Sequence, residues 1–257
     1  MEKPLVLSEM VDSIAILTLN HPEKRNALSH ALLTHLQEHL NRIATDRDVR
    51  VVILRGAGPA FSAGHDLREL VGGNEEQYRE LFALCAEVME AIRKLPQPVI
   101  AQVHGIATAA GCQLAATCDL VVAAEDASFA TPGVKIGLFC STPAVALARA
   151  VPPKKALEML LTGNLIPARE AERIGLVSRV VPADCLAVET LNLARQICKA
   201  SSYTLALGKR TFYEQLHLDR PAAYEVASRA MVENAQAPDA QEGMRAFLEK
   251  RAPRWKD

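Results

Sequence analysis

Residues 61–67 read FSAGHDL and bring a histidine and an aspartate together directly after small residues. The segment follows an apolar run at 49–54 and a loop that contains two glycines and a proline. The ordinary pKa of histidine lies nearest to neutral pH among the side chains, so His65 can exchange a proton under physiological conditions. Small residues let a bound molecule approach the backbone closely. The pattern fits either a functional site or a tight junction between a strand and a helix.

A second run of small residues occupies positions 105–111, after an apolar segment at 97–103. Alanines and a glycine at 109–111 keep side chains away from the place where a helix should begin. Free N–H groups at a helix start carry partial positive charge and can stabilise an oxygen that gains negative charge. Close packing of a helix on a sheet would also explain the small residues. A second N–H donor on a neighbouring loop would favour a site, and Ala63 is the candidate.

Strands and helices alternate in the first half of the chain. Continuous apolar runs predict strands at 14–19, 51–54, 97–103 and 120–124. Apolar residues recur at helical spacing over 28–43 and 78–92, with Asn26 or Ser29 as the first N-cap, and a short helix is expected between the third and fourth strands. This alternation predicts an α/β fold whose parallel sheet is covered by helices.

Helical patterns dominate the chain from about residue 143 onward. They cover 143–151, 154–162, 168–174, 184–200, 203–215, 219–235 and 239–250, and 177–181 alone looks extended. No low-complexity linker separates the two parts, so we expect one functional unit.

The composition excludes several classes of partner. The chain has 257 residues, 49% of them apolar, and a net charge of −1, which gives no basic surface for nucleic acid or an anionic membrane. Its apolar runs are too short to span a bilayer. The six cysteines show no metal-like pairing, and no signal or transit peptide is evident, so we expect a reduced, cytoplasmic protein.

Several segments together resemble the crotonase (enoyl-CoA hydratase/isomerase) superfamily. They follow one another in family order over nearly the whole chain. The segments are NHPEKRNAL at 20–28, AFSAGHDL at 60–67, the run 104–119, ASFATP at 127–132, LTG at 161–163, EA at 170–171 with GLV at 175–177, and FLEKRAP at 247–253.

The resemblance implies a crotonase-like (ClpP/crotonase) core of repeated ββα units at 1–195 and a helical oligomerisation region at 196–257. Relatives of this kind form homotrimers, often paired into hexamers. They bind acyl-CoA thioesters, so coenzyme A enters as part of the substrate and we expect neither a further cofactor nor a metal site. Two backbone N–H groups hold the thioester oxygen as an enolate develops, and by position these belong to Ala63 and Ala110. The resemblance also implies a set of coenzyme A contacts at Lys24, Arg25, Ala27, Asp66 and Leu67, with Phe247 and Lys250 reaching in from a neighbouring subunit.

Both acids that active hydratases use are replaced here. Hydration needs two carboxylates that position and activate one water and deliver a proton. By resemblance their positions are Gln113, whose amide can orient a water but cannot take its proton, and Gly133, which has no side chain. Hydratase activity is therefore doubtful, and His65 becomes the titratable group beside the expected N–H pair.

Three alternatives follow from the missing acids. A decarboxylase of malonyl- or methylmalonyl-type thioesters resembles this segment in carrying a histidine after Ser-Ala-Gly, and loss of CO2 gives an enolate without a base. A protein that binds acyl-CoA without turnover would also fit. Cys140 and Ser141 are candidate nucleophiles for thioester hydrolysis with His65, although no nucleophile signature surrounds them.

Overall fold

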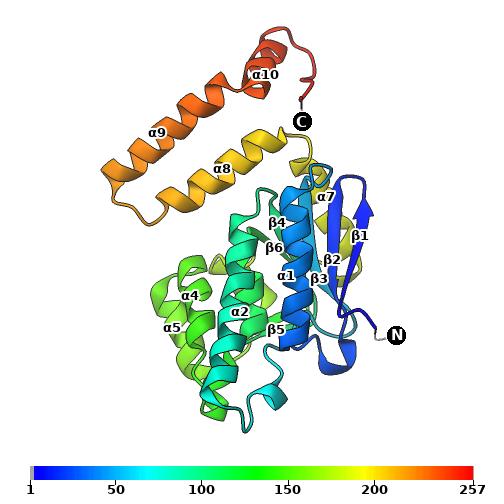
Figure 1. The fold of residues 1–257 in the computed structure, drawn as a ribbon, viewed down its shortest axis with the longest axis vertical. Coiled ribbons are helices and arrows are strands. Elements are labelled where there is room, and N and C mark those ends of the chain that lie inside the picture. Colours follow the sequence, from blue (N-terminus) through cyan, green and yellow to red (C-terminus); the bar gives the residue numbers. More distant parts are fainter. Residues whose placement is uncertain (1–2, 257) are drawn as a thin grey trace.

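A six-stranded sheet forms the centre of the molecule (Figure 1). The computed structural model describes residues 3–256. The strands lie in the order β1-β2-β3-β4-β6-β9, and every neighbouring pair is parallel except β1 and β2. The bounds are β1 (Val6–Val11), β2 (Ile14–Leu19), β3 (Val51–Gly56), β4 (Val99–Val103), β6 (Leu120–Ala124) and β9 (Arg179–Val181).

The middle strands supply the centre of the hydrophobic core. β2 and β4 are buried along their whole length, which explains their mainly apolar sequences. Ile16 pairs with Ile53, which in turn pairs with Ile100, so β-branched side chains form a row across three strands. The predicted α/β fold with a mainly parallel sheet is confirmed.

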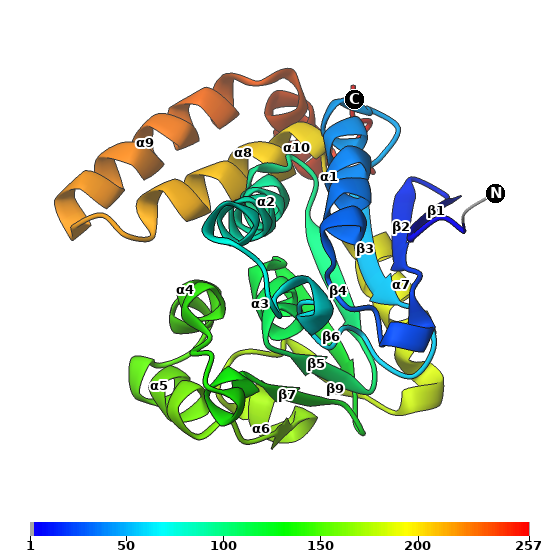
Figure 2. The same cartoon turned by 60° about the horizontal axis from the view of Figure 1, so that its bottom comes forward.

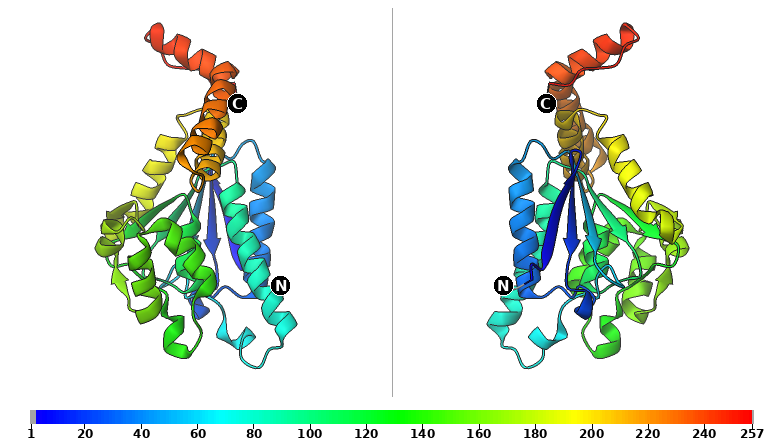
Figure 3. Two further views of the ribbon diagram at one scale, coloured as in Figure 1. Left: turned by 90° about the vertical axis from the view of Figure 1, so that its left-hand side faces the viewer. Right: turned by 90° about the vertical axis from the view of Figure 1, so that its right-hand side faces the viewer.

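Helices cover both faces of this sheet. α1 (His30–Thr45) and α2 (Glu75–Lys94) lie on one face, and α7 (Leu186–Ile197) lies on the other (Figure 3). The side chain of Ser29 accepts a hydrogen bond from the Leu32 N–H, so Ser29 and not Asn26 is the N-cap of α1.

A smaller sheet and a group of short helices stand at one end of the main sheet (Figure 2). Its strands are β5 (Ile106–Thr108), β7 (Ser128–Ala130) and β8 (Ile166–Pro167). α3 (Ala110–Thr117) starts directly after β5, is buried along its whole length and packs against α4 (Ser141–Ala150). The remaining elements there are α5 (Pro153–Thr162), α6 (Ala168–Arg173) and four 3-10 turns, η1 (Pro22–Lys24), η2 (Leu67–Glu69), η3 (Pro132–Ile136) and η4 (Ala183–Cys185).

The C-terminal helices α8 (Ser202–Gln215), α9 (Arg220–Gln236) and α10 (Pro238–Leu248) form an arm that projects from the core (Figures 1 and 3). A buried ion pair fastens the arm to the core. The Lys209 ammonium lies 2.7 Å from the Asp119 carboxylate and donates to the carbonyl oxygens of Ile92 and Gln97, each at 3.0 Å. The Tyr213 hydroxyl donates to the same carboxylate at 2.7 Å.

Some elements differ from the sequence prediction. β1 was not predicted, because only Val6 among its six residues is buried and the strand therefore lacks an apolar run. β5, β7 and β8 are two or three residues long, which is too short to show a period. Among residues 3–256, no helix combines the length and the apolar character that crossing a bilayer requires.

Candidate active site

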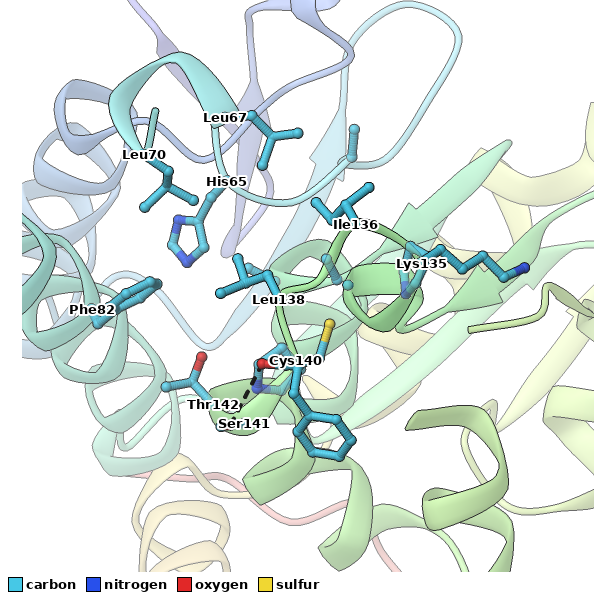
Figure 4. A pocket seen from close by; sticks show the side chains of 17 residues that line it. His65, Leu67, Leu70, Phe82, Lys135, Ile136, Leu138, Cys140, Ser141 and Thr142 are labelled. Atoms are coloured by element: carbon cyan, nitrogen blue, oxygen red, sulfur yellow. Dashed lines mark hydrogen bonds between the residues drawn. The ribbon is translucent and has the colours of Figure 1, made fainter. Parts of the chain in front are cut away.

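A cavity of about 480 Å³ opens where four segments meet: the loop after β3, α2, the start of α3, and the chain from η3 to α4 (Figure 4). Its wall is mainly apolar, which suits an apolar ligand held by a few polar groups. Five residues expected at the site from the sequence line this cavity together. They are Ala63, His65, Leu67, Ala110 and Gly133.

Asn26 fixes the loop after β3 through hydrogen bonds to its main chain. Its buried side-chain amide donates to three main-chain carbonyl oxygens, those of Ala57, Ala60 and Phe61, at 2.8–3.2 Å. Its amide oxygen accepts from the His21 N–H at 2.9 Å. Sequence analysis did not assign this role, because an asparagine in a turn shows no sign of which distant carbonyl groups it will bind.

Gly64 lets this loop touch the start of α3. Its φ is +90°, and a Cβ placed there would lie 2.8 Å from the Ala109 Cβ and 3.2 Å from the Ala110 nitrogen. Any side chain would therefore separate the two segments. The close approach brings the backbone of His65 and the first turn of α3 to the same cavity.

The structure corrects one of the two expected N–H donors. The Ala63 N–H donates to the Arg25 carbonyl oxygen at 3.0 Å, so it is already engaged within the chain. Two residues further, the His65 N–H has no acceptor among residues 3–256, and neither does the Ala110 N–H at the start of α3. The N–H groups of His65 and Ala110 are therefore two free donors on residues that line the cavity.

The His65 ring is fixed in one tautomer. Its Nδ1 lies 3.0 Å from the Leu28 carbonyl oxygen, which can only accept, so Nδ1 carries the proton. Its Nε2 is buried and has no partner among residues 3–256, and the ring packs edge-on against Phe82 with centroids 5.5 Å apart. Burial lowers the pKa of His65, while the Leu28 hydrogen bond and the charge of Glu69 oppose that shift less strongly. The ring is therefore neutral at pH 7, with a bare lone pair on Nε2.

The space beside Gly133 is filled by main chain. A Cβ on Gly133 would lie 2.0 Å from the Leu138 carbonyl oxygen and 2.8 Å from the Cys140 sulfur. The Leu138 N–H donates to the Gly133 carbonyl oxygen at 3.0 Å and closes the turn that follows η3. A larger residue at position 133 has no room in this conformation.

Gln113 lies on α3 and is 5% exposed, but it does not line the cavity. Its Oε1 is buried without a hydrogen-bond partner among residues 3–256, and the same is true of the Thr131 hydroxyl. Neither residue lines the cavity. The Gln113 amide can accept a hydrogen bond but cannot take up a proton at neutral pH.

Three of the expected coenzyme A contacts, Lys24, Arg25 and Asp66, are charged. Lys24 and Asp66 pair with each other at 2.9 Å, and the Lys24 hydrogen bond holds the pKa of the Asp66 carboxyl below its ordinary value. Asp66 also caps η2 by accepting from the Arg68 N–H. Arg25 is exposed beside them, and no ion pair to its side chain is formed within the described part of the chain.

Two further expected contacts, predicted to reach the site from a neighbouring subunit, lie in the arm. Phe247, 83% exposed, and the exposed Lys250 lie at the end of α10 and do not line the cavity of their own chain. Ala27 is buried beneath the loop, whereas Leu67 is 48% exposed at the cavity mouth.

The cysteine at the cavity is not activated. Cys140 is 7% exposed, and burial raises the pKa of its thiol, so the thiolate that nucleophilic attack requires is disfavoured. No three His, Cys, Asp or Glu side chains within residues 3–256 are grouped so that they could hold a metal ion.

The wall also contains residues that sequence analysis missed, among them Phe82, Leu138 and Thr142 (Figure 4). Phe82 was recognised only as part of the apolar face of a helix. The apolar spacing that placed it on that face is the same whether the face meets the core or a cavity, so the sequence carried no signal for its second role.

Comparison with known proteins shows close relatives. The chain is 51% identical over 255 residues to enoyl-CoA hydratase domain-containing protein 3, mitochondrial, of Rattus norvegicus. The match covers 99% of this chain and 85% of that protein. A crystal structure of the human protein of that name has a TM-score of 0.96 at 51% identity and covers 98% of this chain and all of the other. An enoyl-CoA hydratase crystal structure from Mycobacterium smegmatis has a TM-score of 0.97 at 48% identity, over 99% of this chain and 100% of that one.

These relatives contradict the expected cytoplasmic location. The proteins from rat, mouse and human are 51–52% identical to this chain and are named mitochondrial. The expectation rested on the scattered cysteines and on the composition of the first residues. The residues of a folded domain do not record the compartment to which a separate targeting signal directs the protein.

The family follows from the extent of the match. A family model described as enoyl-CoA hydratase/isomerase matches residues 9–257, and the solved relatives share the whole arrangement of two sheets and covering helices. The predicted crotonase-like α/β fold is thereby confirmed. The chain belongs to the enoyl-CoA hydratase/isomerase family.

Proposed function

We propose that this protein binds acyl-CoA thioesters and stabilises their enolate form between the N–H groups of His65 and Ala110. One observation carries the proposal: His65 and Ala110, whose N–H groups have no acceptor among residues 3–256, line the same apolar cavity of about 480 Å³. The acyl chain would occupy the cavity, and the thioester oxygen would accept from both donors. Backbone donors are fixed before the ligand arrives, and each is typically worth about 3–4 kcal/mol to a developing oxyanion.

The coenzyme A part would leave the cavity along the loop after β3 and the turn at η1. Leu67 lies exposed at the mouth, and Lys24 and Arg25 supply positive charge beside it. Lys24 is already paired with Asp66, so Arg25 is better placed to meet a phosphate group. This proposal takes the thioester as substrate and needs no further cofactor or metal.

Hydration of a double bond is not the activity that the site favours. Gln113 provides no acid, and the Leu138 carbonyl occupies the space that a side chain on residue 133 would need. This chain would then be a family member that lacks both catalytic glutamates. A decarboxylase of malonyl- or methylmalonyl-type thioesters would use the same two N–H groups, because loss of CO2 yields the same enolate without a base.

The arm supports assembly into a homotrimer or a pair of trimers. α9 has no buried residue within the chain, and Phe247 and Leu248 of α10 are about four-fifths exposed. Apolar side chains this exposed are typical of surfaces that another subunit covers. Light scattering after size-exclusion chromatography should give three or six times the 27.9 kDa chain mass.

Calorimetric titration with a non-hydrolysable acyl-CoA analogue tests the binding, with free coenzyme A as the control. We expect the acyl compound to bind more tightly, because the cavity takes the acyl chain. No heat and no thermal protection at millimolar analogue would contradict the proposal. Loss of enoyl absorbance from crotonyl-CoA tests hydration, and mass spectrometry of malonyl- and methylmalonyl-CoA tests decarboxylation.

A further inference from the structure

The His65 imidazole is the side chain on the cavity wall that is placed to take a proton. Lys135 also lines the cavity, but its ammonium donates to Asn164 at 3.1 Å and points away from the cavity in Figure 4. The Cys140 thiol is held protonated, because burial raises its pKa. Ser141 and Thr142 carry hydroxyls, which do not accept a proton at neutral pH.

The ring is anchored through Nδ1, whereas its Nε2 has no partner among the described residues. Leu28 accepts the Nδ1–H at 3.0 Å, and the edge-on contact with Phe82 restricts rotation of the ring. Nε2, the remaining acceptor, is buried and has no partner within residues 3–256. A buried acceptor without a donor costs free energy. A ligand group that supplies a proton to Nε2 would recover this cost.

His65 also contributes a backbone N–H to the proposed oxygen site. The N–H and the imidazole belong to one residue, so a thioester oxygen bound to this N–H lies near the ring. The α-carbon of the acyl group is bonded directly to the carbonyl carbon and therefore lies near the ring as well. A single residue therefore presents a donor to the oxygen and a base to the adjacent carbon.

We infer that His65 Nε2 is the general base that removes a proton from the acyl carbon next to the thioester carbonyl. The inference rests on the proposed function, because the two N–H groups must hold the thioester oxygen. In this step the C–H bond breaks, its electron pair forms the carbon–carbon double bond of the enolate, and the carbonyl oxygen takes the negative charge. The proton passes to Nε2, and the imidazolium keeps its Nδ1–H on the Leu28 carbonyl.

The reverse step returns a proton to the same carbon. No oxidant, reductant or second substrate is needed, and the net result in heavy water is replacement of hydrogen by deuterium. This reaction isolates the base from whatever later step the natural substrate undergoes.

The experiment measures deuterium uptake by butyryl-CoA in heavy water, by proton NMR and mass spectrometry. We expect uptake at the carbon next to the carbonyl with the full chain. His65→Ala keeps the backbone N–H but removes the ring, and His65→Gln keeps an acceptor that cannot be protonated. Both should lower the exchange rate by about a hundredfold or more, the usual range for a general base.

Two controls separate a catalytic role from a structural one. Added imidazole should restore exchange in His65→Ala, because the substitution leaves a cavity of imidazole size. If His65 had only a structural role, added imidazole would not restore exchange. His217→Ala removes an exposed histidine of the loop between α8 and α9 and should leave exchange unchanged.

The outcomes distinguish this inference from the proposal on which it rests. Failure of the full chain to bind the acyl-CoA analogue overturns the proposed function, and the inference with it. Binding without exchange overturns the inference alone, as does exchange at the original rate in both His65 variants. Exchange that His65→Ala loses and imidazole restores supports it.

Discussion

Restoring an acid at position 133 should destabilise the protein without creating a hydratase. The variants are Gly133→Ala, which adds only a Cβ, and Gly133→Glu, which adds the carboxylate. In the structure that Cβ would lie 2.0 Å from the Leu138 carbonyl oxygen and 2.8 Å from the Cys140 sulfur. The nearest atom is backbone, so the turn after η3 must move before any side chain fits.

The cost can be estimated from the contacts that this movement breaks. Forcing extra atoms into a closed space costs about 1–3 kcal/mol. Losing the Leu138 N–H bond to the Gly133 carbonyl adds about 1 kcal/mol. A total of about 2–4 kcal/mol corresponds to a fall in Tm of roughly 5–15 °C for a chain of this size.

Thermal unfolding and the crotonyl-CoA assay test this reasoning. Gly208→Ala is the matched control: nothing lies within 4 Å of its added Cβ, and alanine in a helix should raise stability by about 0.5–1 kcal/mol. Gly133→Ala with an unchanged Tm would refute the steric argument. Gln113→Glu combined with Gly133→Glu should remain inactive in hydration, and a gain of activity at native stability would refute the claim that the position is closed.

Three other perturbations have defined outcomes. Asn26→Ala leaves three carbonyl oxygens and the His21 N–H without their partner, so unfolding free energy should fall by about 2–4 kcal/mol in denaturant titration, with weaker acyl-CoA binding. Arg25→Ala should weaken coenzyme A binding and its salt dependence more than Lys24→Ala, because Lys24 is paired with Asp66; equal losses by calorimetry would contradict this assignment. Burial lowers the pKa of His65 below its ordinary 6.5, so the unfolded chain binds more protons below that pH, and stability should fall as pH drops from about 7.5 through the folded-state pKa. His65→Ala should flatten this dependence in thermal melts, and an unchanged slope would count against a neutral buried ring.

The sequence predicts those parts of the fold that depend on patterns of burial. β2, β4 and β6 are mainly apolar because both sheet faces are covered, and the apolar residues of α1 from Leu32 to Ile43 recur at helical spacing. β1 lies at the sheet edge with one buried residue, so no such pattern marks it. Apart from the candidate nucleophiles Cys140 and Ser141, residues of the cavity were found only where a family motif pointed to them.

The direction of a backbone N–H is beyond what a sequence pattern can give. Ala63 and His65 are two residues apart in one motif, yet the first donates to Arg25 and the second has no acceptor within the described chain. Gly64 separates them with a φ of +90°, a conformation that turns the chain and that glycine adopts without strain. Which of the two donors remains free depends on this turn and on the position of the Arg25 carbonyl oxygen. Both are set by the tertiary structure and leave no pattern in the sequence.

The glycine at 133 and the histidine at 65 are physically coupled, because both line one cavity. A negative charge held near the ring would raise the pKa of His65. With glycine there, the Leu138 chain closes the wall, the cavity stays apolar, and desolvation keeps the imidazole neutral. The apolar wall beside Gly133 therefore helps to keep the His65 imidazole neutral at pH 7, with Nε2 free to accept a proton.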